Sequence, residues 1–126
     1  MSPTVELQKS IYMAVSAVGY STYDDVPTDA VYPYVVIGDD TLVDDSADDT
    51  QGLNATVTVH SFSSYRGKAE IKKIQDDIYT ALDRVALPIT GYVVLDCLQE
   101  FAQTFLDQDG ITRHGVQRFR VNFYKQ

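Results

Sequence analysis

Residues 53–62 have the sequence LNATVTVHSF, and this stretch decides the fold. Apolar and polar side chains alternate along it without interruption as far as His60. A period of two is typical of a strand that buries one face and leaves the other half exposed. The buried face is expected to carry Leu53, Ala55, Val57 and Val59. A strand of this kind needs other elements of the chain to cover its apolar face.

The first such cover is expected immediately downstream, where apolar residues recur at helical spacing. Their positions place them on one side of a helix: Ile71, Ile74, Ile78 and Leu82. Lysines and aspartates occupy the opposite side, as in a helix that packs on a sheet. Ser63 or Ser64 is expected to cap this helix, and Pro88 to end it.

A second helix is expected at the start of the chain. Ser2 can cap it, and Pro3 suits the first helical position because its missing N–H would have no partner there. Four apolar residues then form one face, Leu7, Ile11, Val15 and Val18. Gly19 is expected to end this helix, and the polar residues 20–29 to form a connector.

Three further strands complete the expected fold. They span residues 32–38, residues 92–104 with a bulge, and residues 116–124, which alternate again. Residues 107–110 (DQDG) favour a hairpin turn. The resulting order is α-β-loop-β-α-β-β in one domain, residues 1–126. We therefore predict an α+β fold in which two helices cover one face of an antiparallel, or mixed, sheet.

Charge is distributed unevenly along the chain, whose net charge is −8. Residues 1–52 contain ten acidic residues and one basic residue, whereas residues 53–126 contain eight acidic and nine basic residues. Six aspartates lie in a stretch expected to be a long, exposed and mobile loop, namely Asp39, Asp40, Asp44, Asp45, Asp48 and Asp49. Because DNA binding requires a basic surface, this composition argues against a protein that grasps DNA.

Candidate catalytic and metal-binding residues are few. The two histidines, His60 and His114, are expected at the surface or in an interface, and Cys97 is expected as a buried, inert thiol. Asp107 and Asp109 resemble the opening of a calcium loop, but Arg118 stands where the loop needs a glutamate. We therefore expect no catalytic site, no metal and no cofactor.

No apolar run approaches the roughly 20 residues that span a bilayer, so no membrane association is expected. The N-terminus also lacks the basic and apolar segments of a signal peptide. A soluble protein that stays inside the cell is the resulting expectation.

Arginines near the C-terminus are the candidate interface residues. Arg118 and Arg120 share one face of a predicted strand, and Arg113 and His114 lie nearby. Arginine is enriched in protein interfaces. Together with Arg66, these residues could meet the acidic part of a second copy in a head-to-tail contact, which closes into a ring if the rotation allows.

The order of several motifs resembles the tail-completion proteins of long-tailed phages and phage-like particles, in the tail-terminator group. The resemblance spans nearly the whole chain. It rests on residues 7–12 (LQKSIY), 31–38 (VYPYVVIG), 64–70 (SYRGKAE) and 109–120 (DGITRHGVQRFR). The last segment is the most specific of the four. The density of aspartate in residues 39–49 departs from the family pattern.

The resemblance implies a structural protein of the virion, assembled in the host cytoplasm, without enzymatic activity. Such proteins form a ring, commonly a hexamer, on the head-proximal end of the tail tube. The implied partners are other copies of the chain, the tail tube protein and a head-side connector, and the ring stops tube polymerisation. DNA passes through without specific binding. The acidic loop is expected at the lumen or on a ring face, where it would order on assembly.

Two alternatives remain open from the sequence. The chain could be another neck component, such as a head-completion, stopper or adaptor protein. It could also be a small ligand-binding or enzymatic α+β domain centred on His60 or His114, which would require a pocket with converging polar groups.

Overall fold

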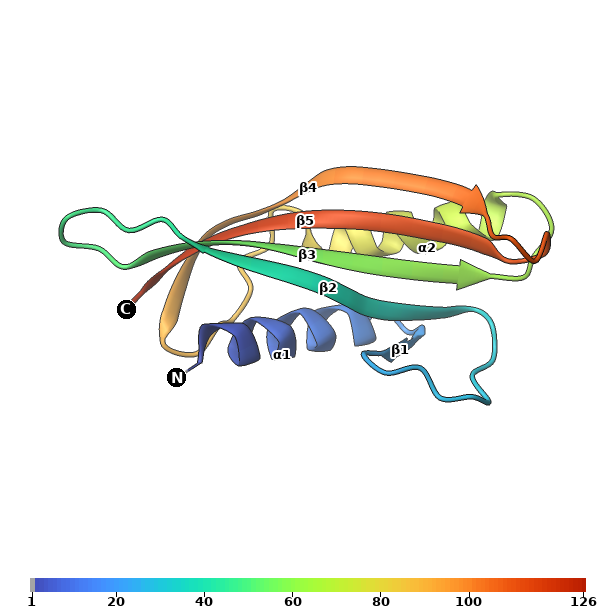
Figure 1. Cartoon of the computed structure of the whole chain (residues 1–126), viewed down its shortest axis with the longest axis horizontal. Helices are drawn as coiled ribbons and strands as arrows, with labels where there is room; N and C mark the ends of the chain where they lie inside the picture. The colour runs from blue at the N-terminus through green and yellow to red at the C-terminus, as the bar shows by residue number, and fades with distance from the viewer. Residues whose placement is uncertain (1) are drawn as a thin grey trace.

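The computed structural model describes residues 2–126 and contains two helices and one five-stranded sheet (Figure 1). The elements are α1 (Pro3–Ser16), β1 (Ser21–Tyr23), β2 (Tyr34–Asp44), β3 (Gly52–Ser63), α2 (Ala69–Leu82), β4 (Tyr92–Leu106) and β5 (Arg113–Lys125). The strand order is β1-β2-β3-β5-β4. β1 pairs with β2 in parallel, and the other pairs are antiparallel. The predicted α+β class is confirmed, with β1 as an additional strand inside the expected connector.

α1 begins where the sequence predicts. The Ser2 hydroxyl accepts a hydrogen bond from the Val5 N–H, and Pro3 occupies the first turn. The helix buries Leu7, Ile11 and Val15 completely or nearly so. It ends at Ser16, slightly before the predicted end, and the chain then turns at Gly19 with a positive φ of 112°.

α2 carries the predicted apolar face, but both of its predicted ends are wrong. Its N-cap residue is Lys68, whose side chain makes no capping hydrogen bond. Ser63 is instead the last residue of β3, and its hydroxyl donates to the Glu70 carboxylate at 2.6 Å. The helix ends at Leu82 and not at Pro88, because Asp83 adopts an extended backbone and Arg84 a positive φ. The four predicted core residues of α2 are fully buried.

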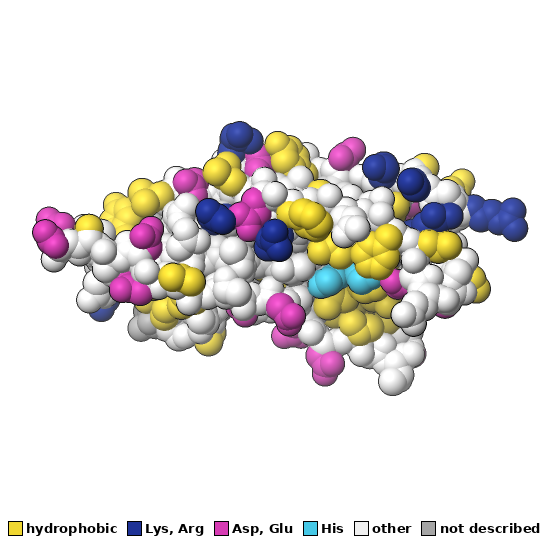
Figure 2. All heavy atoms as spheres, turned by 45° about the horizontal axis from the view of Figure 1, so that its top comes forward, with side chains coloured by type: hydrophobic (Ala, Val, Ile, Leu, Met, Phe, Trp, Pro, Cys, Tyr) yellow, Lys and Arg dark blue, Asp and Glu magenta, His cyan; other side chains and the backbone are white. Residues whose placement is uncertain are grey.

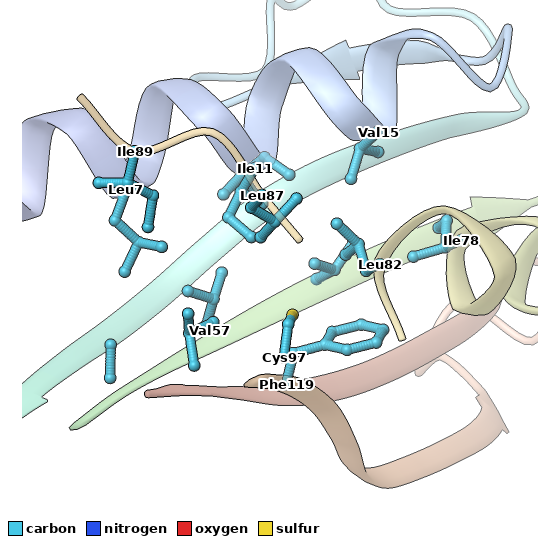
Figure 3. Packing of buried hydrophobic residues seen from close by; sticks show 14 of the residues in the cluster. Leu7, Ile11, Val15, Val57, Ile78, Leu82, Leu87, Ile89, Cys97 and Phe119 are labelled. Carbon is cyan, nitrogen blue, oxygen red and sulfur yellow. The ribbon is translucent and has the colours of Figure 1, made fainter. Parts of the chain in front are cut away.

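The core lies between the two helices and one face of the sheet (Figure 3). β3 and β5 contribute its centre, and Phe119, Val121 and Phe123 are at most 1% exposed. Leu87 and Ile89, from the segment after α2, close the core beside α1. Ala55, Val57 and Val59 are buried as predicted, whereas Leu53 is partly buried. Within residues 2–126, no helix combines the length and apolar character needed to cross a membrane.

The predicted bulge in β4 is confirmed, and the structure contains two of them. The pairing of β4 with β5 shifts between Val94 and Asp96 and again between Gln99 and Phe101. The predicted turn after β4 is also present, with the Gly110 N–H donating to the Asp107 carbonyl at 3.0 Å. Gly110 has a φ of 71°, a conformation that favours glycine.

The prediction of a long mobile loop over residues 39–52 is wrong. β2 continues through Asp39 and Asp40 to Asp44, and its end pairs with the start of β3. Ala47 and Thr50 exchange backbone hydrogen bonds, so Asp48 and Asp49 form the turn between them. Aspartate is depleted in strands, which hid this extension in the sequence. We call residues 44–52 the acidic hairpin; Figure 1 shows that it extends beyond the helical layer.

Candidate functional site: the uncovered face of the sheet

The two helices cover one face of the sheet and leave the other face open (Figures 1 and 2). Because side chains alternate along a strand, every second residue of β3 and β5 points to the open face. These residues are half-buried or exposed, in contrast to their neighbours in the core. The open face is therefore the largest part of the sheet that is available to another molecule.

A row of neighbouring rings, some stacked and some tilted, crosses this face at the end near the β4–β5 turn. The strand register aligns its members, because Tyr34 lies opposite Phe62, Phe62 opposite His114, and His114 opposite Phe105. Neighbouring ring centroids are 5.0, 4.4 and 4.6 Å apart, and Tyr32 extends the row at 5.4 Å from Tyr34. We call these five residues the aromatic row. Figure 2 shows apolar side chains around the two histidines.

His114, a member of the aromatic row, forms a short hydrogen-bonded chain with His60 and Asp107. The distance from His60 Nδ1 to His114 Nε2 is 2.8 Å, and that from His114 Nδ1 to Asp107 Oδ1 is 3.1 Å. One arrangement satisfies both contacts: His114 donates Nδ1–H to Asp107, and His60 donates Nδ1–H to His114 Nε2. The sequence placed both histidines at the surface or an interface, but only the register of β3 and β5 brings them together.

Burial lowers the pKa of His60, and the neighbouring charge of His114 lowers it further, against a smaller opposing effect of Asp39. His60 also lies directly on the backbone of β2, since a Cβ added to Gly38 would meet the His60 ring at 2.7 Å. The hydrogen-bonding partners found for the two imidazoles are each other and the Asp107 carboxylate.

Arg118 and Arg120 share the open face, and both form ion pairs with one glutamate. Arg118 Nε lies 3.0 Å from Glu100 Oε1, and an Arg120 guanidinium nitrogen lies 2.8 Å from Glu100 Oε2. Arg118 also lies 5.2 Å from the centre of the Phe101 ring. Two arginines share one carboxylate, so this group keeps an excess positive charge on a half-exposed surface.

Arg66 and Arg113 lie together at one end of the sheet, apart from the Arg118–Glu100–Arg120 group. They line a cleft of 590 Å³ with Ser64, Gly67, Gly110 and Ile111. The cleft joins the β3–α2 loop to the β4–β5 turn. Neither arginine is paired with a carboxylate among residues 2–126. We call this feature the arginine cleft.

The six aspartates of residues 39–49 lie in two different places, within β2 and in the acidic hairpin. Asp39 lies in the irregular part of β2 near His60, and Asp40 pairs with Val57. Asp44, Asp45, Asp48 and Asp49 belong to the acidic hairpin, and all four are exposed. The region described contains no group of three or more acidic, histidine or cysteine side chains arranged to hold a metal ion.

Sequence reasoning missed an apolar patch on the outer side of α1. Val5 and Met13 are each 62% exposed there, and Tyr12 is 39% exposed. Their spacing along the helix was the available signal, because it places them opposite the predicted core residues. Since α1 covers the sheet, this patch and the open face lie on opposite sides of the molecule.

Cys97 points into the core, as expected. It is completely buried, and burial raises the pKa of its thiol to about 12. The thiolate that reacts with disulfides and alkylating agents is therefore scarce at neutral pH.

Comparisons with known proteins identify one family by sequence and a shared fold by structure. A family model described as "Tail completion protein gp17" matches residues 12–124. The tail completion protein gp17 of Bacillus phage SPP1 is 32% identical over 96 residues, which cover 75% of this chain and 71% of that protein. The structure of bacteriophage SPP1 gp17 protein aligns with a TM-score of 0.60 at 26% identity, over 91% of this chain and 86% of the other. A chain in the virion of a native gene transfer agent particle shares the fold, with a TM-score of 0.86 at 19% identity over 98% of both chains.

Proposed function

Because the chain belongs to the family of the phage tail completion protein gp17 and is a tail or neck component of a virion, we propose that it caps the tail tube as a ring. The ring is proposed to be a hexamer on the head-proximal end of the tube. It would end tube polymerisation and supply the surface that joins the head. Its partners would be the last ring of tube protein and a head-side connector.

One observation carries this proposal: two unlike exposed surfaces lie on opposite sides of the molecule. The open face presents the aromatic row and the Arg118–Glu100–Arg120 group. The opposite side presents the apolar patch of α1. Apolar side chains that gather at the surface favour contact with another molecule. A closed ring of identical subunits requires two different surfaces on each subunit, because its contacts are heterologous.

The acidic hairpin supports the same arrangement. It carries four aspartates and no basic residue between positions 44 and 51. In a ring, a projection of this length would reach beyond its own subunit, to the lumen or across a ring face. A negative lumen would repel phosphates and let DNA pass without binding.

The proposal includes no enzymatic step. The histidine chain would contribute to the shape and polarity of a contact surface, with Asp107 fixing the orientation of His114. The variant His60→Gln/His114→Gln tests this point. It should still complete tails, unless the two side chains are themselves buried in a subunit contact. If the two histidines were catalytic, this variant would assemble normally but would lose the enzymatic activity.

The test is the addition of purified protein to isolated tail tubes, followed by electron microscopy of the tube ends. We expect decoration at one end only and no further growth when tube protein is added. Phe105→Asp, on the open face, should abolish decoration, whereas Asp76→Ala, on the exposed side of α2, should not. Wild-type protein that never decorates tubes would overturn the proposal. Binding to a connector instead of the tube would identify another neck component.

A further inference from the structure

We propose that the arginine cleft binds the tip of the acidic hairpin from a second copy of this chain. The inference rests on the proposed ring and specifies one of its contacts. It places the hairpin across a ring face, over the neighbouring subunit, and gives Asp48 and Asp49 the role of ligands for Arg66 and Arg113.

The arginine cleft has the chemistry of a carboxylate site. It contains two guanidinium groups, and no acidic residue lines it. Arginine presents several N–H donors in a plane and binds carboxylates through two parallel hydrogen bonds. Uncompensated arginines around a concave surface therefore favour an anionic occupant.

The N-terminus of α2 adds to this preference. Gly67 lines the cleft, and α2 begins at Ala69 with no side-chain cap. The first N–H groups of a helix lack internal partners and carry partial positive charge. The Glu70 carboxylate does not cap them, because it accepts the Ser63 hydroxyl at 2.6 Å. An external carboxylate at the cleft would interact favourably with this end of the helix.

The tip of the acidic hairpin offers the matching groups. Asp48 and Asp49 occupy the turn, held by the backbone hydrogen bonds between Ala47 and Thr50. Their side chains are exposed, and the only hydrogen bond to either is the Thr50 hydroxyl on Asp49 at 3.3 Å, as far as the described chain goes. A paired turn presents its carboxylates with less loss of conformational freedom on binding than a disordered loop.

The contact must join two copies. The hairpin and the cleft lie at opposite ends of the sheet, so no chain can fill its own cleft (Figure 1). Each subunit carries both halves of the contact, so the contact can repeat from subunit to subunit, and it gives a ring where the rotation closes. Four aspartates in the hairpin against two arginines at the cleft make the two ends complementary in charge.

Disulfide trapping tests the geometry. Asp48→Cys with Ile111→Cys places one thiol on the hairpin and one at the cleft, where Ile111 is 67% exposed. Cys97 does not interfere, because it is buried. Mild oxidation of assembled protein should give a ladder of covalent oligomers up to the ring. The control Asp24→Cys with Ile111→Cys uses another exposed acidic position and should give no ladder, and neither should the single variants.

Charge exchange tests the chemistry. Asp48→Arg/Asp49→Arg and Arg66→Glu/Arg113→Glu should each weaken self-association by about tenfold or more, measured by sedimentation velocity at low salt. The combined quadruple variant should recover most of the loss, because the charges are complementary again. Asp24→Lys/Asp25→Lys is the matched control and should associate as the wild type does.

The outcomes separate this inference from the proposed function. If the wild type caps tubes but the thiol pair gives no ladder and the reversals have no effect, the hairpin contact is wrong and the ring stands. If no form of the protein decorates tubes, the proposed function fails. A cleft reversal that leaves self-association intact but abolishes binding to a tube or connector protein would assign the cleft to that partner, and would overturn the inference.

Discussion

The two faces of the sheet are built from the same strands and differ in almost every physical property. In β5, Phe119 is completely buried against the helices, whereas its neighbour Arg118 is half exposed on the open face. In β3, Val57 and Val59 pack in the core, and Thr58 and His60 lie on the other side. The covered face holds mostly aliphatic and aromatic side chains, with a few buried polar ones such as Gln117, and the open face holds rings, imidazoles and ion pairs.

Because of this difference, a residue on the covered face contributes mainly to folding, and its neighbour on the open face mainly to contacts with other molecules. The covered face supplies the buried apolar area that stabilises the fold. Substitutions on the open face change what the molecule can bind while they leave that area intact. Four perturbations test the separation, and they are ordered by the size of the expected effect on stability.

The largest effect is expected for Phe119→Ala, which removes a fully buried ring at the centre of the core. The free energy of unfolding should fall by about 3–5 kcal/mol, measured by urea denaturation. Phe105→Ala is the matched variant on the open face, where the ring is 38% exposed. It should cost about 1 kcal/mol or less. Equal losses for the two variants would mean that the two faces do not differ in this way.

A smaller loss, about 1–3 kcal/mol, is expected for Gly38→Ala, because the new methyl group would overlap the His60 ring. The displaced ring should also lose its hydrogen bond to His114, visible as a change in the imidazole NMR signals. In the His60→Ala background the penalty should be clearly smaller but not zero, because the Thr58 carbonyl would still lie 3.1 Å from the new methyl group. A full penalty in that background would place the strain in the backbone and not at His60.

The stability of the protein should fall as the pH is lowered from about 6.5. The pKa of His60 is lowered in the folded state, so below pH 6.5 the unfolded chain binds more protons and is favoured. Asp83 and Asp109 also have lowered pKa values, but these act below about pH 3.8. Urea midpoints at pH 7.5 and 5.0 measure the change. In His60→Gln, stability should depend less on pH in this interval. An unchanged pH dependence would mean that another group causes it.

The smallest effect is expected for Glu100→Gln, which removes the shared partner of two half-exposed arginines. Exposed ion pairs contribute little, so the free energy of unfolding should fall by less than about 1 kcal/mol. The effect should shrink further at 0.5 M salt. A loss as large as that of Phe119→Ala would show that the open face contributes to folding as strongly as the core.

The covered face was predictable from the sequence, because burial imposes a period on residue types. The apolar stripe of α2 and the alternation in β3 and β5 placed the correct residues in the core, except for Leu53, which is only partly buried. The ends of the elements were less predictable. Ser63 looked like a helix cap. Instead, β3 includes Ser63, and the Ser63 hydroxyl donates a hydrogen bond to the Glu70 carboxylate.

The open face was not predictable, because its features depend on register between distant strands. His60 and His114 are 54 positions apart in the sequence, and only the pairing of β3 with β5 joins them. Glu100 likewise meets two arginines from the neighbouring strand, across a bulge that shifts the register. The acidic hairpin was missed for a different reason, since exposed strands beyond the core carry no apolar signal.

The two bulges of β4 have a further consequence, since this strand is the outer edge of the sheet. An unprotected edge presents free backbone N–H and C=O groups, and these can recruit strands from other molecules into fibres. Irregular pairing twists such an edge and interrupts its hydrogen-bonding pattern. At the other edge, β1 is only three residues long. These two features of the edges protect the protein against aggregation through its own backbone, independently of its side chains.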